Sequence, residues 1–209
     1  MLKTIRYAAF AVIAALAVVW GVVWWRGGGI AQFGLDNLGI SVPGGVSVGG
    51  PFTLVDTTGA TVTDATFRGR WMLVYFGYTY CPDVCPTELQ TVVAALDAIG
   101  PLAKRIVPVF ITIDPERDTP AALAEYVKLF DDRLVGLTGT REQVAAAARA
   151  YRVYYARANS TSTTSYLMDH SSFIYLIGPD GSFRALFRQG MGATDLADAL
   201  KARLSAREN

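Results

Sequence analysis

The chain has 209 residues, 19 of them basic and 18 acidic, and a formal net charge of +1 at neutral pH. This length allows one globular domain and some additional segment, but not several domains. The charge balance, without any local cluster of lysine or arginine, excludes nucleic acid as a partner.

The first predicted element is a transmembrane helix over the uncharged apolar residues 7–25, which as a helix span about 28 Å, close to the bilayer core of roughly 30 Å. The basic residues Lys3 and Arg6 before it predict a cytoplasmic start and an exported domain. A cleaved signal peptide is the alternative, but the run is long and ends without an Ala-x-Ala site. We therefore predict an uncleaved membrane anchor over residues 1–26.

The predicted host membrane is a bacterial inner membrane, crossed once, with the C-terminal domain in the periplasm. This prediction rests on the six residues before the apolar run, which are too few for an organelle transit peptide. Residues 27–50 are rich in glycine and hold no sustained period, so they are predicted to be a flexible tether, with packing of residues 33–42 on the domain as the alternative.

The domain proper is predicted over residues 51–209 and begins with a hairpin, because short β-type runs at 52–55 and 61–63 flank Thr58-Gly59. Residues 71–76 are continuously apolar, as in a strand buried on both faces, and the helical period of residues 86–99 follows. A second buried strand is predicted over 106–113. Thr119-Pro120 then caps a second helix over 121–130, which completes two crossover units.

The remainder of the chain predicts a short strand at 135–138 and a helix that ends near Tyr151, introduced by the capping box of Thr140 and Gln143. Residues 156–166 are expected to form an exposed polar loop. Strands at 172–177 and 182–187 flank a turn, and leucines at 196, 200 and 204 form a closing helix. This order predicts an α/β fold, a thioredoxin-like central sheet with flanking helices, preceded by the membrane helix.

The chemistry of the chain centres on its two cysteines, Cys81 and Cys85, which follow the first buried strand and lie at the entrance of a helix. The positive end of a helix dipole favours thiolate, which improves nucleophilicity and metal affinity. Both cysteines precede prolines, so we expect a tight loop with the helix starting at or near Pro86, and a disulfide is then geometrically possible. A regular helix would separate the Cβ atoms by about 5–6 Å, too far for a disulfide but suitable for a bridging metal.

His170, the sole histidine, is the predicted third donor. A lone histidine is usually structural, but two thiolates form an incomplete metal site, and parallel strand packing is expected to bring His170 beside the first helix. Two sulfurs and one imidazole suit copper better than zinc, which prefers four ligands. Asp169 or a nearby carbonyl is expected to hold the other ring nitrogen, with a solvent-facing Asp169 as the alternative. The aspartates at 83, 114 and 118 are assigned to turns and caps.

Several motifs resemble the Sco/SenC copper-chaperone family over residues 51–204: YTYCPDVCP at 78–86, IDPERDTP at 113–120, DHSS at 169–172 and YLIGPDG at 175–181. The resemblance implies a membrane-anchored thioredoxin-like domain that binds copper, as Cu(I) or Cu(II), through Cys81, Cys85 and His170. It also implies a role in assembling the binuclear copper site of cytochrome c oxidase subunit II, or of a related copper-site protein.

Two other functions stay open at this stage. The protein is a thiol-disulfide oxidoreductase if Cys81 and Cys85 act as a redox pair that reduces the copper-site cysteines of a partner. It is a redox or copper sensor if the site only signals. A peroxidase is disfavoured, because the cysteines lack the Thr-x-x-Cys arrangement of peroxiredoxins. The sequence leaves open whether the protein is an enzyme.

Overall fold

The structure, a computed structural model, describes residues 48–158 and 166–205, all of which belong to one compact unit. The predicted anchor and most of the predicted tether lie outside these residues. Among the helices within the described ranges, none has the length and hydropathy required to cross a bilayer.

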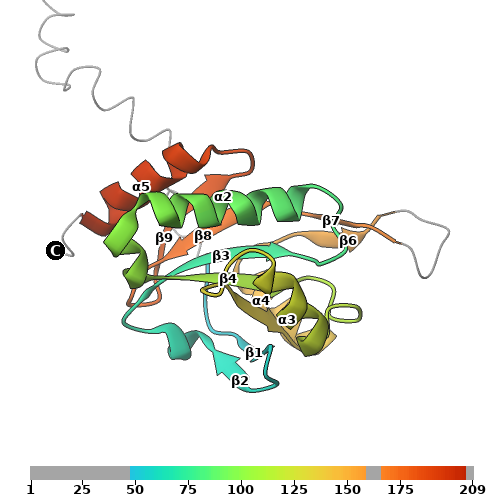
Figure 1. The fold of residues 1–209 in the computed structure, drawn as a ribbon. Coiled ribbons are helices and arrows are strands. Elements are labelled where there is room, and N and C mark those ends of the chain that lie inside the picture. Colours follow the sequence, from blue (N-terminus) through green and yellow to red (C-terminus); the bar gives the residue numbers. More distant parts are fainter. Residues whose placement is uncertain (1–47, 159–165, 206–209) are drawn as a thin grey trace, which may run out of the picture. The chain divides into compact units, whose positions relative to one another are not determined.

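A seven-stranded sheet in the order β2-β1-β5-β4-β3-β8-β9 forms the centre of the fold (Figure 1). Its strands are β1 (Thr53–Asp56), β2 (Thr61–Thr63), β3 (Trp71–Gly77), β4 (Ile106–Thr112), β5 (Val135–Thr138), β8 (Phe173–Ile177) and β9 (Phe183–Arg188). The α-helices are α2 (Val84–Ala98), α3 (Pro120–Lys128), α4 (Arg141–Ala150) and α5 (Ala193–Ser205). Two short 3-10 helices, η3 (Asp64–Phe67) and η4 (Gly100–Arg105), precede β3 and β4.

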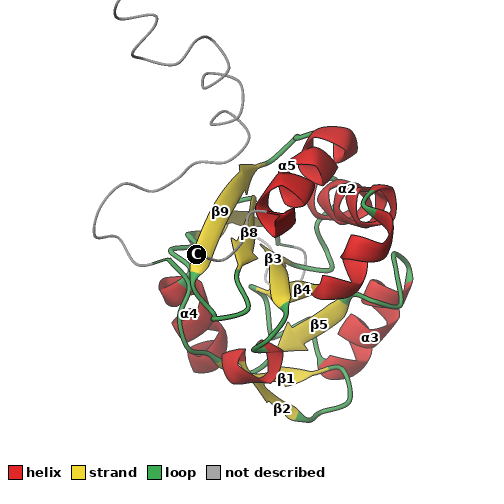
Figure 2. Cartoon of the chain, turned by 90° about the vertical axis from the view of Figure 1, so that its left-hand side faces the viewer, coloured by secondary structure: helices red, strands yellow, loops and turns green. Residues whose placement is uncertain are grey.

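The helices cover both faces of this sheet (Figure 2). On one face, Phe110 of β4 lies beside Tyr75 of β3 in register and contacts Tyr126 of α3, with ring centroids 5.6 Å apart. On the other face, Phe76 contacts Tyr151, at the end of α4, at 5.3 Å. Helix α5 packs along α2. The predicted α/β arrangement of a sheet between helices is therefore confirmed.

Local signals in the sequence account for most of these elements. Every residue of β3 and β4 is buried, as their continuous apolar runs require. The Thr119 hydroxyl accepts a hydrogen bond from the Ala122 amide at the start of α3. Thr140 and Gln143 form the predicted capping box of α4. These local rules therefore predict the starts of α3 and α4 correctly.

Two elements near the cysteines and His170 differ from the prediction. Helix α2 begins at Val84 rather than near Pro86, because a proline in the first helical turn loses no intrahelical hydrogen bond. A second sheet pairs β6 (Tyr155–Arg157) with β7 (Met168–His170), where a loop was predicted to lead to His170. Strands of three residues leave no detectable period in the sequence, and a tertiary contact supports β7, since the Met168 amide donates to the Tyr78 hydroxyl at 3.1 Å.

Candidate metal centre

The two cysteines lie where β3 gives way to α2. Cys85, in the first turn of α2, is fully buried, and Cys81, in the preceding loop, is partly exposed. The Cys85 sulfur packs directly on the end of β3: a Cβ atom at Gly77 would lie 2.8 Å from it and 2.9 Å from the Phe110 ring. The close approach of sheet and helix therefore requires glycine at this position.

The helix start stabilises the more accessible sulfur. The Cys85 backbone N–H donates to Cys81 Sγ at 3.4 Å, whereas Asp83, the N-cap residue by position, makes no side-chain capping bond. The pKa of Cys81 is lowered, first by the hydrogen bond from the Cys85 thiol and further by His170 and backbone amides. The pKa of Cys85 is raised, because its thiol donates to Cys81 and is buried. The geometry places an accessible thiolate beside a buried thiol.

His170 completes a group of three donor atoms. Its Nε2 atom lies 3.6 Å from Cys85 Sγ, and one donor atom each from Cys81, Cys85 and His170 all lie within 4.8 Å of one another. His170 Nδ1 lies 3.2 Å from the Ser171 carbonyl oxygen. Because a carbonyl only accepts, Nδ1 carries the proton and the Nε2 lone pair is free for a metal.

Of the two predicted partners of the imidazole, the carbonyl is the one that holds it. Asp169 is exposed and points to the opposite face of β7 from His170, because successive side chains of a strand alternate. The solvent-facing alternative for Asp169 is therefore confirmed.

His170 reaches the cysteines through an antiparallel pairing, and the prediction of parallel packing is wrong. Strand β8 runs antiparallel to β3, with Ile174 beside Tyr75, so the start of β8 lies next to the end of β3. A parallel neighbour would begin at the other end of the sheet. His170, three residues before β8, is thereby brought to the entrance of α2.

Two tyrosines of the β3 end enclose the donor atoms. The Tyr75 hydroxyl donates to Cys85 Sγ at 3.7 Å, and burial raises the pKa of Tyr75. The His170 ring packs edge-on against both tyrosines, with centroids 6.3 Å from Tyr75 and 6.0 Å from Tyr78. Nothing in the sequence gives these tyrosines a role in the site, because a tyrosine within or just after an apolar strand run is expected to be part of the core.

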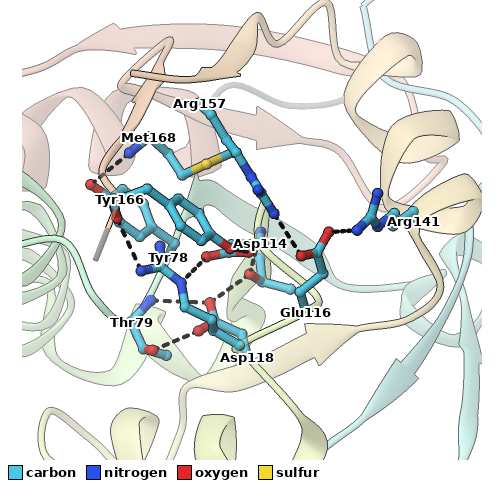
Figure 3. A network of polar contacts seen from close by, with 11 residues as sticks. Tyr78, Thr79, Asp114, Glu116, Asp118, Arg141, Arg157, Tyr166 and Met168 are labelled. Atoms are coloured by element: carbon cyan, nitrogen blue, oxygen red, sulfur yellow. Dashed lines mark hydrogen bonds and ion pairs between the residues drawn. The ribbon is translucent and has the colours of Figure 1, made fainter. Parts of the chain in front are cut away.

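A buried polar network supports the loop between β3 and α2 (Figure 3). Asp118 accepts hydrogen bonds from the Thr79 amide at 3.0 Å, the Thr79 hydroxyl at 2.5 Å and the Thr112 hydroxyl at 2.6 Å. Burial raises the pKa of Asp118. This aspartate does more than cap a turn, because it ties the loop that leads to Cys81 to the end of β4.

The network continues to the segment that leads into β7. Asp114 pairs with Arg117 at 2.5 Å and accepts a hydrogen bond from the Tyr166 hydroxyl at 2.7 Å. The Arg117 guanidinium lies 3.7 Å from the centroid of the Tyr166 ring and 4.6 Å from that of Tyr80. Nearby, Glu116 forms ion pairs with Arg141 and Arg157 (Figure 3). Three segments that are distant in sequence are thus fixed around the cysteine loop.

A groove of about 340 Å³ opens onto the donor atoms. Cys81 and His170 line it, together with apolar side chains that include Val84 and Leu167. The two sulfurs are soft donors and the imidazole nitrogen also suits copper, and a three-donor set suits Cu(I) better than Zn(II), which prefers four ligands. The residues present therefore fit a copper ion that enters from the groove.

Comparisons with known proteins agree with this chemistry. The family model described as SCO1/SenC matches residues 42–205. The human protein SCO1 homolog, mitochondrial, is 48% identical over 155 residues, which are 73% of this chain and 52% of that protein. The chain thus spans about half the length of this relative.

Two solved structures, both with copper bound, share the fold. The crystal structure of Arabidopsis thaliana ScoI has a TM-score of 0.73 and 40% identity, over 77% of this chain and 99% of that one. Bradyrhizobium japonicum ScoI has a TM-score of 0.69 and 41% identity, over 75% and 99%. The predicted thioredoxin-like fold is confirmed at the level of this fold family.

The predicted bacterial inner-membrane location, with a periplasmic domain, is wrong by the same comparison. The similar human, mouse and Arabidopsis proteins are named as mitochondrial. The prediction depended on counting the six residues before the apolar run. That count is no evidence against a transit peptide in a chain that spans about half the length of its curated relatives.

Proposed function

The chain belongs to the SCO1/SenC family, and from this we propose that it is a copper-binding protein of cytochrome c oxidase assembly. The observation that carries the proposal is the convergence of the Cys81, Cys85 and His170 donor atoms within 4.8 Å of one another. The three residues come from the loop after β3, the start of α2 and β7, so the site forms only in the folded domain.

In this proposal copper is the cargo, and Cys81, Cys85 and His170 are its ligands. Thiolate sulfur favours Cu(I), and the imidazole offers Nε2 because Nδ1 is engaged by the Ser171 carbonyl. Each sulfur also accepts a hydrogen bond, from the Cys85 amide and the Tyr75 hydroxyl respectively. Such partners fix the orientation of a donor before the metal arrives.

Delivery to the binuclear copper site of cytochrome c oxidase subunit II is the proposed outcome. The groove exposes Cys81 and His170 to a partner, while Cys85 is buried. Incoming ligands would then replace the exposed donors before the buried one. The apolar residues 7–25 are proposed to hold the domain at a membrane, and residues 27–50 to give it reach.

The test is the copper content of purified full-length protein. One Cu(I) per chain is expected, with loss of stoichiometric binding in Cys81→Ser, Cys85→Ser and His170→Ala. Transfer is measured by mixing loaded protein with the apo copper domain of oxidase subunit II and following metal by mass spectrometry. Full copper retention by all three variants would contradict the ligand set, and absence of transfer from loaded protein would contradict delivery.

Thiol-disulfide exchange is a second candidate, favoured by the lowered pKa of the partly exposed Cys81. Its thiolate would attack a partner disulfide to give a mixed disulfide and release one partner thiol. Cys85 would then displace the second partner thiol and form the Cys81–Cys85 disulfide, which an external dithiol must reduce. This reaction needs no imidazole donor, so His170→Ala separates the two functions by retaining exchange and losing copper.

A further inference from the structure

Tyr75 stands apart from the residues that line the groove, because it is buried and yet contacts two of the three donors. Its hydroxyl oxygen lies 3.7 Å from Cys85 Sγ, and its ring meets the His170 ring edge-on at 6.3 Å. The backbone of β3, paired on both sides by β4 and β8, fixes its position. Core packing alone does not require a tyrosine at this position, since phenylalanine would fill nearly the same volume.

We propose that Tyr75 is a positioning residue of the copper site, whose hydrogen bond to the Cys85 sulfur sets the relative affinity of the site for Cu(II) and Cu(I). The inference rests on the proposed copper-binding function. It assigns Tyr75 no bond to the metal.

The direction of the effect follows from the donor strength of sulfur. A phenol is protonated at neutral pH, so the Tyr75 O–H donates and the sulfur accepts. A hydrogen bond draws electron density from the sulfur and makes it a weaker donor to copper. The weaker sulfur donor lowers the affinity for Cu(II) more than the affinity for Cu(I), because Cu(II) needs more electron density from its ligands. The hydroxyl therefore favours the reduced ion.

The chain offers a matched control in Tyr126 of α3. Both tyrosines pack against the ring of Phe110, with centroids 6.3 Å away for Tyr75 and 5.6 Å for Tyr126. The Tyr126 hydroxyl, however, is buried without a hydrogen-bond partner among the described residues. Tyr126→Phe thus removes a buried hydroxyl from the same aromatic cluster without removing a bond to sulfur.

The experiment compares wild type, Tyr75→Phe and Tyr126→Phe, each loaded with one copper. In Y75F the sulfur-to-Cu(II) charge-transfer band is expected at longer wavelength than in wild type. The ratio of Cu(II) to Cu(I) affinity, measured by chelator competition, is expected to rise about tenfold, the usual scale of one charge-assisted hydrogen bond. In Y126F both quantities should equal those of wild type.

The outcomes separate this inference from the function on which it rests. Wild-type protein that binds no copper overturns both. Wild type and Y75F that bind copper with the same band and the same affinity ratio overturn the role of Tyr75 alone, as does an equal change in Y126F. If Y75F fails to fold, the hydrogen bond is tested instead by resonance Raman spectra of the wild-type copper protein refolded in H₂O and in D₂O. A Cu–S stretching frequency that does not move overturns the hydrogen bond.

Discussion

The Nε2 atom of His170 lies 3.6 Å from the sulfur of Cys85, although 85 positions separate the two residues in the chain. The antiparallel pairing of β8 with β3 produces this proximity, and the β6–β7 pair holds the backbone of His170. The spacing of the two cysteines is a local property of the sequence, whereas the third donor depends on tertiary structure.

Replacing His170 by alanine is expected to weaken Cu(I) binding by about 100-fold or more, since even the loss of a group that only holds a metal ligand in place costs about 10–100-fold. Competition with a Cu(I) chelator measures the loss. Asp169→Asn is the matched control, because Asp169 is the neighbouring residue on the exposed face of β7. An unchanged affinity in His170→Ala, or an equal loss in Asp169→Asn, would contradict the imidazole's role.

The apoprotein is expected to react with iodoacetamide at Cys81 in mild acid. The pKa of Cys81 is lowered to about 3, so this residue is still a thiolate at pH 5. In an ordinary thiol, the thiolate fraction falls about tenfold for each pH unit below the pKa. Cys85→Ala removes the largest cause of the lowering, and labelling at pH 5 should slow. A wild-type rate that falls tenfold per unit between pH 8 and pH 5 would refute the prediction.

Asp118→Ala is expected to lower the free energy of unfolding by about 2–4 kcal/mol, because it leaves the buried hydroxyl of Thr112 and two partly buried donors of Thr79 unpaired. Urea unfolding followed by circular dichroism measures the change. Glu125→Ala serves as the control: its carboxylate pairs with Lys128 on the surface, and its loss should cost no more than about 0.5 kcal/mol. Equal effects in the two variants would show that the Asp118 network contributes little.

Glu88→Gln is expected to stabilise the protein at neutral pH. Glu88 is buried in α2, where it accepts a hydrogen bond from the Gly190 amide at 2.8 Å, and burial raises its pKa. A carboxyl group with a raised pKa stabilises the fold below its unfolded pKa, and this stabilisation is lost as the pH rises through the folded pKa. Glutamine keeps the acceptor oxygen and stays neutral at every pH.

Thermal unfolding of wild type and Glu88→Gln at pH 4 and pH 7 measures this effect. The variant should exceed wild type by about 2–4 °C at pH 7, the shift that roughly 1 kcal/mol produces in a domain of this size. The difference should shrink toward pH 4. A pH-independent difference would mean that Glu88 is not the group responsible.

Much of the fold could be predicted because its signals are local. Continuous apolar runs identify β3 and β4, and the caps at Thr119 and Thr140 locate α3 and α4. The location of the cysteines at a helix entrance follows from the same rules. The tether, the anchor and the metal ligation by Cys81, Cys85 and His170 remain predictions.

The remaining features depend on contacts between distant residues. Strands β6 and β7 have three residues each, and β7 gains support from the distant Tyr78 hydroxyl. Asp118 resembled a turn residue until Thr79, 39 positions earlier, proved to be its partner. Tyr75 resembled a core residue, because the apolar pattern of the sequence indicates which side chains are buried but not where a hydroxyl group points. Composition and spacing do not encode such pairings.

The hydrogen atom that takes the place of a side chain at Gly77 sets a limit on how this site can vary. With the Cys85 sulfur 2.8 Å and the Phe110 ring 2.9 Å from where a methyl carbon would stand, even alanine would force the sulfur, the ring or the strand to shift. Glycine is the smallest residue, so position 77 offers no smaller alternative. Transplanting this donor trio into another scaffold would therefore begin with a strand that ends in glycine.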